Sequence, residues 1–268
     1  NEHDTMQSPL QLPKLLNRFQ EFLNRSVQPA AQVHPRIAKT PLSPLVSKFG
    51  GKPYLKFGES LPTNPKAEIL TFIAQLNFAE LTARLPMLGE VLPTKGILQF
   101  FYDLEEAPWG GGLEDSAYWR VIFHPEPDLA HCENMTIPIL SASEEASIEY
   151  SLLHSFPDVE ILNELFTLSE TEEEAYLEFM DTDDSSKHQV LGYPWSIQGD
   201  PCFEAQSLSK QLFPNSESAE PWHLLWQIDS DEVLDFMWGD MGMLYILIQE
   251  QDLRKADFSR VIFVLQCY

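Results

Sequence analysis

Near the start of the chain, apolar residues recur at helical spacing. Leucines and phenylalanines lie three or four positions apart between Leu12 and Leu23, with charged and amide side chains between them. Ser8 suits a helix cap, and Pro9 suits the first helical turn. The pattern predicts an amphipathic helix over residues 8–27 whose apolar face packs on the protein's own core.

Further along the chain the period changes to two, which is typical of strands. In residues 72–78 the even-numbered side chains are apolar and are predicted to share one face, whereas Gln75 and Asn77 lie on the other. The same alternation returns around Gln227 and Asp229. Mostly apolar runs that predict further buried strands lie at 96–102, 121–123, 242–248 and 261–265. Turns, and not helices, separate these runs, which indicates antiparallel sheet and argues against a doubly wound fold.

The strand runs contain an internal repeat. Arg-Val-Ile-Phe occurs at 120–123 and again at 260–263, and three weaker matches precede each copy in the same order. These pair Gly51-Lys52-Pro53-Tyr54 with Gly192-Tyr193-Pro194-Trp195, Gln75-Leu76-Asn77 with Gln227-Ile228-Asp229, and Gly96-Ile97-Leu98 with Gly242-Met243-Leu244. In chain order the offsets are 141, 152, 146 and 140 residues. Because they differ only by lengths that loops absorb, they predict a duplicated fold.

Together these patterns predict a mainly β protein with a few helices (α+β), in which roll-like antiparallel sheets come from two pseudo-repeated halves. A chain of 268 residues is long enough to bury a full core without disulfide or metal staples. The predicted organisation is a single domain over 1–268, with the N-terminal helix 8–27, a first half 45–130, an acidic insert 131–187 and a second half 188–268.

Two segments outside the strand runs are predicted to lie outside the sheet. Four prolines between Val33 and Pro53 indicate an irregular connector. Thr171 and Glu174 have the spacing of a capping box, which predicts a helix within the acidic insert that continues to Met180. The six residues after Met180 are predicted to form an exposed linker.

The charge of the chain is strongly negative and unevenly distributed. The formal net charge is −24. Residues 121–186 hold 17 Asp and Glu and no Lys or Arg, whereas residues 1–60 hold eight bases and four acids. Such a field repels phosphate backbones and anionic lipid surfaces, so neither nucleic acid nor a membrane is an expected partner. The acidic stretch is either a solvated face that keeps the protein soluble or a docking surface for a basic protein partner.

Composition also predicts a compartment. No apolar run approaches the roughly 20 residues of a membrane span, and the first residues lack the basic and apolar regions of a signal peptide. The three cysteines lie far apart in the sequence, as in proteins that keep their thiols reduced. These observations predict a cytoplasmic protein.

The sequence contains none of the common catalytic or phosphate-binding motifs. There is no H-E-x-x-H, no G-x-S-x-G, and no glycine-rich loop that ends in Gly-Lys-Ser/Thr. The seven histidines are scattered. We therefore predict neither a metal site nor a cofactor, and the sequence favours a protein that is not an enzyme.

Polar and aromatic residues of the second half make up the candidate binding site. Its members are His188, Asp200, Gln227, Asp229, Trp238 and Asp240. Aromatic rings are common pocket walls. The acids around Asp229 have the oxygen ligands that suit Ca²⁺ or Mg²⁺, but their spacing departs from the EF-hand loop. The favoured interpretation is that Gln227 and Asp229 hydrogen-bond to backbone at an irregular strand end.

Several of these segments together resemble a known family. They are Lys48-Phe49-Gly50-Gly51-Lys52-Pro53-Tyr54, Ala74-Gln75-Leu76-Asn77-Phe78, Gly96-Ile97-Leu98-Gln99-Phe100-Phe101, Leu191-Gly192-Tyr193-Pro194, Gln198-Gly199-Asp200-Pro201, Leu225-Trp226-Gln227-Ile228-Asp229-Ser230 and Trp238-Gly239-Asp240-Met241-Gly242. From about residue 45 to the C-terminus the chain is similar to the YwqG-like proteins of bacteria. The resemblance implies a mainly β, roll-like fold and supplies no catalytic residues. Some members are encoded beside secreted-toxin systems, which suggests an immunity-like role by analogy.

Two functional hypotheses follow from the sequence. The first is a non-catalytic cytoplasmic interaction protein that presents its acidic insert to a basic partner. The second is a small-molecule or carbohydrate binder, or an unrecognised hydrolase, that uses a cleft between the halves. They differ in whether an apolar pocket with convergent polar groups lies beside His188, Asp200, Gln227 and Asp240.

Overall fold

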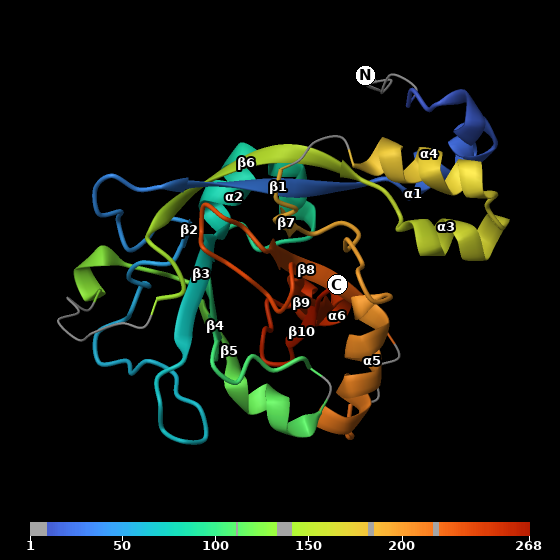
Figure 1. Ribbon diagram of the computed structural model, residues 1–268. Helices are drawn as coiled ribbons and strands as arrows, with labels where there is room; N and C mark the ends of the chain where they lie inside the picture. The colour runs from blue at the N-terminus through green and yellow to red at the C-terminus, as the bar shows by residue number, and fades with distance from the viewer. Residues whose placement is uncertain (1–9, 111, 133–140, 182–184, 217–219) are drawn as a thin grey trace.

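The computed structural model describes residues 10–268, except for 111, 133–140, 182–184 and 217–219. Within these residues, ten strands form one sheet in which all neighbouring strands are antiparallel (Figure 1). They are β1 (Gln28–Ile37), β2 (Lys48–Phe49), β3 (Thr71–Asn77), β4 (Ile97–Tyr102), β5 (Trp119–His124), β6 (Ala146–Ser155), β7 (Gln189–Val190), β8 (Trp222–Asp229), β9 (Met243–Gln249) and β10 (Ile262–Gln266). The predicted mainly β, antiparallel fold is confirmed.

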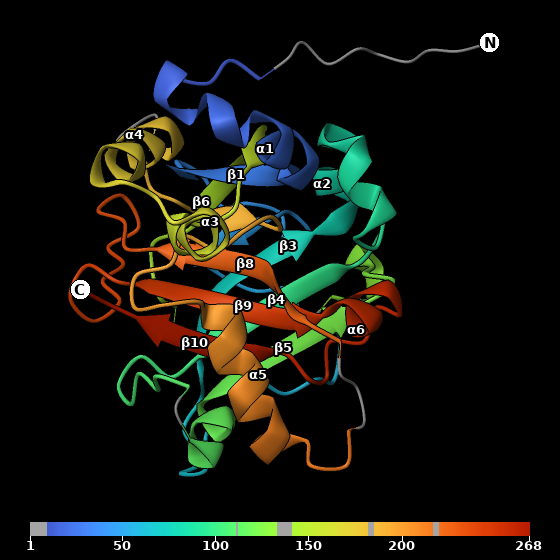
Figure 2. The same ribbon diagram turned by 90° about the vertical axis from the view of Figure 1, so that its right-hand side faces the viewer.

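The sheet curls into a nearly closed barrel, so that its two ends face each other across one core (Figure 2). The ring of Phe100 on β4 lies 5.1 Å from that of Trp226 on β8, and Trp119 on β5 stacks on Phe263 of β10 at 5.5 Å. At the edge of β10, the N–H of Leu265 donates to the carbonyl of Trp109 at 3.2 Å. This contact covers part of a strand edge that would otherwise expose unpaired backbone groups.

The order of the strands has the symmetry of a duplication. It reads β10-β9-β8-β7-β1-β6-β2-β3-β4-β5. Let β1–β5 be the counterparts of β6–β10, taken in order. Replacing every strand by its counterpart then gives the same strand order read from the opposite edge of the sheet. The first strand of each repeat pairs with the second strand of the other repeat, β1 with β7 and β6 with β2. The repeats have therefore exchanged their first strands, and β1 and β6 join them at the middle of the sheet.

Strand register supports the same equivalence. One row of neighbours runs Lys48, Gln75, Gln99, Ile122, and the matching row runs Gln189, Gln227, Tyr245, Val264. Three offsets in these rows, 141, 152 and 146 residues, are those of the sequence matches. A register shift interrupts β3 between Phe72 and Ala74, and another interrupts β8 between Leu224 and Trp226, again 152 positions later. A shared bulge position indicates a common origin, because bulges are retained within families.

The first Arg-Val-Ile-Phe copy lies within β5 and the second runs into the start of β10, the outer strands of the two repeats, but the copies are not in register. Ile122 on β5 matches Val264 on β10, an offset of 142 residues, whereas the sequence match gives 140. A shift of two residues keeps every side chain on its original face of the strand. The sequence match was therefore right about the strand and wrong by two positions in register.

Strand β1 replaces the first part of the predicted connector. It runs from Gln28 to Ile37 and carries Pro29 and Pro35, which favoured irregular structure. The short strand β7 pairs only with Ala31 and Gln32 of β1. The N–H of Val33 donates to the carbonyl of His188, the residue just before β7. Like Val33, Pro29 and Pro35 are odd-numbered, so their backbone nitrogens point to the side of β1 on which β7 lies. Both prolines lie beyond the ends of β7, so no ladder hydrogen bond is lost at either of them.

A second correction concerns the alternation in β3. The bulge places Phe72 with Leu70 and Phe101 in a small separate cluster, while Ile73 joins the main core. The even-numbered side chains therefore do not all share one face. The bulge was invisible in the sequence because both faces of this strand are apolar at Phe72 and Ile73.

The N-terminal helical segment packs mainly on the acidic insert. It consists of the 3-10 helix η1 (Lys14–Phe19) and α1 (Gln20–Ser26), and the predicted cap at Ser8 lies outside the described residues. Leu16, Phe19 and Leu23 form a separate core with Leu162 of α3 (Val159–Phe166) and Tyr176 of α4 (Glu170–Met180). These helices lie together at the upper right of Figure 1, to one side of the barrel.

Helix α4 begins two residues earlier than the predicted capping box implies. Ser169 is the cap, and its hydroxyl and the Glu172 side chain make the reciprocal bonds predicted for Thr171 and Glu174. The Glu172 carboxylate also accepts two hydrogen bonds from Arg18, at 2.7 and 2.9 Å. A base from the start of the chain therefore neutralises part of the acidic insert.

The remaining helices connect strands or cover the outside of the sheet. They are α2 (Phe78–Arg84), α5 (Pro201–Leu212) and α6 (Glu250–Arg254), with 3-10 turns η2 (Pro86–Glu90), η3 (Leu113–Tyr118) and η4 (Leu129–His131). None of the helices in the described residues has the length and apolar character of a membrane span.

Candidate functional site

A buried glutamine holds the loop that follows β7. The side-chain carbonyl of Gln227 accepts from the N–H of Trp195 at 2.9 Å, and its amide donates to the carbonyl of Lys187 at 2.8 Å. Gln75 does the same in the first repeat, with Tyr54 and Val46. Trp195 and Lys187 lie 141 positions after Tyr54 and Val46, which is also the offset between the two loops. The predicted bonding of Gln227 to backbone is therefore correct, and the contact is a shared architectural one.

The turn within this loop requires a left-handed backbone. Leu191 has φ 63° and Gly192 has φ 77°, and the equivalent Gly50 and Gly51 have φ 57° and 68°. A Cβ on Gly192 would lie 2.6 Å from the Ser155 hydroxyl. The chain therefore needs glycine here both for its conformation and for the close approach of β6.

His188 is a structural residue with no free ring nitrogen. Its Nδ1 accepts from the N–H of Asp229 at 3.0 Å, so Nε2 carries the proton and donates to Asp231 at 2.9 Å. The Asp231 carboxylate also accepts from Ser186, Val233 and Leu234. Burial alone would raise the pKa of Asp231, but the hydrogen bonds from His188 and Ser186 outweigh it and hold that pKa well below its ordinary value.

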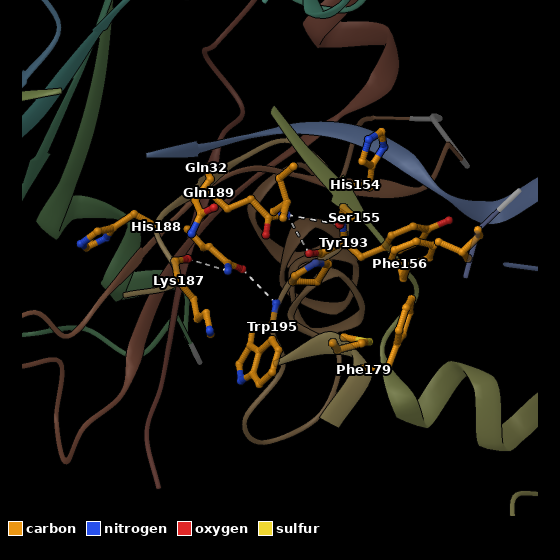
Figure 3. A pocket seen from close by; sticks show the side chains of 15 residues that line it. Gln32, His154, Ser155, Phe156, Phe179, Lys187, His188, Gln189, Tyr193 and Trp195 are labelled. Atoms are coloured by element: carbon orange, nitrogen blue, oxygen red, sulfur yellow. Dashed lines mark hydrogen bonds between the residues drawn. The ribbon is translucent and has the colours of Figure 1, made fainter. Parts of the chain in front are cut away.

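A cavity of about 210 Å³ opens between this loop, the end of β6 and the end of α4 (Figure 3). Its apolar walls are Leu10, Leu153, Phe156, Phe179, Met180, Tyr193, Pro194 and Trp195. Its polar lining consists of Gln32, His154, Ser155, Lys187, His188, Gln189 and Gln227. No Asp or Glu is among these lining residues. In a protein of net charge −24, this is a local reversal of electrostatic character.

The ammonium of Lys187 lies at the rim of this cavity. It is 5.5 Å from the centre of the Trp195 ring and 2.7 Å from the Asp181 carboxylate. The Lys187 side chain is 22% exposed and that of Asp181 52%. On the helical side, the rings of Phe156 and Phe179 pack together with centres 5.1 Å apart. The cavity thus combines a rigid polar floor, aromatic walls and one cation.

The structure distributes the six predicted site residues over several places. His188 and Gln227 line the cavity. Asp229 lines a neighbouring, more open hollow of about 340 Å³, and Asp200 lines a third of about 200 Å³. Trp238 is buried, and its indole N–H donates to the carbonyl of Asp229. Asp240 is exposed, and its carbonyl accepts from the N–H of Tyr268. The six therefore do not converge on one site.

Several acids of this region have structural roles. Asp200 caps α5 by accepting from the N–H of Cys202 at 2.8 Å. Asp229 accepts from the N–H of Lys187, and burial raises the pKa of its carboxyl group. Among the described residues, no three His, Cys, Asp or Glu are placed to hold a metal ion.

Sequence reasoning missed most of the cavity walls. Ser155 ends a strand that was not predicted, and Phe156 follows it. Phe179 and Met180 end a helix predicted only as part of an acidic insert. These positions carry no shared motif. Trp195 could have been predicted from the sequence, because it belongs to the repeated Gly-Tyr-Pro-Trp segment and its backbone N–H is bound by Gln227 of the same repeat.

Comparison with known proteins gives a family and no functional relative. No curated protein matches the chain. The model of a family described as a domain of unknown function (DUF1963) matches residues 47–267, which span β2 to β10. The chain therefore belongs to the DUF1963 family.

Proposed function

We propose that this protein is a binding protein whose ligand is a small organic molecule held in the cavity beside Trp195. The observation that carries the proposal is the lining of that cavity, in which aromatic walls surround a polar floor and no carboxylate is present. Concave, mostly apolar sites with a few placed polar groups are typical of small-molecule sites. The floor is preorganised because Gln227 and His188 are fixed by their own hydrogen bonds.

A cavity-filling variant tests this proposal. Met180 lies on the last turn of α4 and lines the cavity, so we expect Met180→Trp to fill it. Leu177→Trp, on an exposed position of the same helix, is the matched control. Indole is the probe, and backbone amide shifts of the full chain are the readout. We expect indole to shift the amides of the cavity residues in the wild type and in Leu177→Trp but not in Met180→Trp. Equal shifts in all three proteins, or no shifts in any, would rule the site out.

A second candidate function is docking of a basic protein partner on the acidic helices. Helices α3 and α4 carry exposed glutamates together with leucines that are 58% exposed at Leu165 and 40% exposed at Leu177. The exposed acids are Glu160, Glu164, Glu170, Glu173, Glu174 and Glu178. Exposed leucines on helices rich in carboxylates suit a basic amphipathic segment. This role matches an immunity-like protein, in which an acidic face would neutralise a basic toxin.

A defined peptide tests the docking hypothesis. We expect a synthetic Leu/Lys amphipathic peptide to bind the full chain with an affinity that falls as salt rises. The double variant Glu173→Gln and Glu174→Gln is expected to weaken binding more than Glu105→Gln and Glu114→Gln, which remove the same charge from another exposed surface. Equal weakening by both pairs would show that only net charge matters and would refute a specific surface.

Within the DUF1963 family, we propose that the chain is a YwqG-like member. The proposal is supported by the repeated Gly-x-Pro-aromatic and Gln-x-Asn/Asp segments, which hold equivalent loops in the two repeats. An experimental structure of a YwqG-like protein tests it. The expected result is the same exchange of first strands between repeats, and a different strand order would contradict the assignment.

A further inference from the structure

One end of the Gln189 side chain is hydrogen-bonded and the other is not. Its amide nitrogen donates to the carbonyl of Tyr193 at 3.0 Å (Figure 3) and to that of Leu191 at 2.7 Å. Because both partners are carbonyl oxygens, they fix which end of the amide is the nitrogen. Among the described residues, no donor reaches its Oε1. The neighbouring Gln227 differs, since both ends of its amide are used.

This unpaired acceptor belongs to the cavity beside Trp195. Gln189 is only 8% exposed, and it lines this cavity and neither of the two neighbouring hollows. In the described part of the chain, the unpaired polar atoms sealed in the interior are the Tyr150 hydroxyl and the indole nitrogens of Trp222 and Trp226. Oε1 of Gln189 is not one of them, so it is open to the cavity. A ligand that displaces water from this acceptor must bring a donor of its own, because a buried acceptor without a partner is costly.

The other polar side chains of the lining impose no such requirement. Gln32 is half-buried and His154 is exposed, so water binds to both beside a ligand. The Ser155 hydroxyl already accepts a backbone N–H at 2.8 Å. Lys187 already pairs with Asp181. Because Gln32, His154 and Ser155 are all able to donate, an acceptor on the ligand is served at several places and does not distinguish one ligand from another.

The charge and the walls of the cavity restrict the group that carries this donor. No carboxylate lines the cavity, and its one permanent charge is the Lys187 ammonium. An ammonium or guanidinium ligand would lose its hydration there without gaining an opposite charge. Phe156, Phe179 and Trp195 supply apolar walls against which flat rings pack well. A cavity of about 210 Å³ has room only for a small ring system.

Resting on the proposed small-molecule function, we infer that the ligand is a small, neutral aromatic ring with an N–H group. The N–H donates to Oε1 of Gln189, and the ring lies against the aromatic walls. Gln189 thereby determines which flat molecules the cavity prefers. The counterpart of Gln189 in the first repeat is Lys48, whose ammonium pairs with Glu145 at 2.9 Å. The first repeat therefore has an ion pair where the second repeat offers an acceptor.

Indole and benzofuran separate the ligand class from mere occupancy of the cavity, because they share a shape and only indole has an N–H. Calorimetry and backbone amide shifts of the full chain are the readouts. We expect indole to bind the wild type about 5- to 100-fold more tightly than benzofuran, which leaves Oε1 of Gln189 without a donor. Gln189→Met should remove most of this preference by weakening indole while leaving benzofuran nearly unchanged.

Gln249→Met is the matched control, since it also removes a buried amide that donates to a backbone carbonyl, but at a position that does not line this cavity. We expect it to keep the full preference for indole. Equal affinity of the wild type for indole and benzofuran, or equal loss of the preference in Gln189→Met and Gln249→Met, would overturn the ligand class while the cavity remained a binding site. If neither probe shifts the cavity residues of the wild type, the proposed function fails as well.

Discussion

The two repeats share their architecture but differ in one connector. Between β1 and β2 the chain uses residues 38–47, whereas between β6 and β7 it uses 156–188, which include α3 and α4. The glutamine contacts to the loop backbone are equivalent in both repeats, so the sheet tolerates either connector. The longer connector supplies Phe156, Phe179 and Met180, and these residues build the aromatic wall of the cavity.

The equivalent region of the first repeat has a different chemistry. Gln32 on β1 pairs with Gln189, and Ser147 on β6 pairs with Lys48, the counterpart of Gln189. Gln32 and Ser147 are therefore equivalent, and by the same offset positions 38–41 correspond to 153–156. A hollow of about 560 Å³ lies there, lined by Lys39, Lys52, Glu144 and Glu145 among others. The two repeats thus provide similar frames, and the one with the longer connector has an apolar, aromatic cavity where the other has a charged hollow.

The largest expected difference between the repeats concerns Lys48 and its counterpart Gln189. Lys48 is buried in the sheet and pairs with Glu145 at 2.9 Å. Lys48→Met leaves that carboxylate without its partner and is expected to lower the free energy of unfolding by about 3–5 kcal/mol. Gln189→Met removes a neutral donor from the carbonyls of Leu191 and Tyr193 and should cost about 1–3 kcal/mol.

Chemical denaturation of the two variants measures this difference. The double variant Lys48→Met, Glu145→Gln is the control, and we expect it to recover part of the loss because no unpaired charge remains. Equal losses for Lys48→Met and Gln189→Met would show that the buried ion pair is not what separates the repeats at this position.

The central glutamines test the shared part of the architecture. Gln75→Leu and Gln227→Leu each leave a buried N–H and at least one carbonyl without a partner. We expect each to lower the free energy of unfolding by about 2–4 kcal/mol, and by similar amounts. If one variant were nearly neutral in denaturant melts, the two loops would not be held in the same way.

Glycines at the loop turns are expected to have a smaller effect. Gly51→Ala and Gly192→Ala combine a positive φ with a close approach of another side chain, and should cost about 1–3 kcal/mol each. Gly58→Ala is the control, because Gly58 has φ 82° but open space around it. Thermal melts should rank Gly58→Ala as the mildest of the three. A cost at Gly58 equal to that at Gly192 would remove close packing from the explanation.

The weakest expected effect is the pH dependence of helix docking on the second repeat. The hydrogen bonds from Arg18 lower the pKa of Glu172 from its ordinary 4.5 to about 2. Because the folded pKa is depressed, this stabilisation is complete above about pH 4.5 and is lost as pH falls toward 2. The protection factors of the α4 amides, which correct for the pH dependence of intrinsic exchange, should therefore fall as pH drops over this range in the wild type. Arg18→Gln should reduce that dependence and leave only the part due to the hydrogen bonds from Ser169, whereas Arg25→Gln, in a pair that is 78% exposed on both sides, should leave it unchanged.

The sequence reveals strands where both faces are apolar or alternate clearly, as in β3, β4, β8 and β9. It conceals β1 and β6, because these joining strands are only partly buried and β1 carries two prolines. The polar floor of the cavity could be predicted in part from the sequence, because the repeated glutamine Gln227 belongs to it. The walls were not, because the cavity arises where the end of β6, the end of α4 and the loop after β7 meet in space. No local pattern encodes that meeting.

The most direct test of the account is a crystal structure of the full chain soaked with indole. The account predicts ligand density in the second repeat, between Trp195 and Phe179, and none in the equivalent hollow beside Lys39 and Lys52. Density only in the first repeat, or in neither, would contradict the claim that the inserted helices create the binding site.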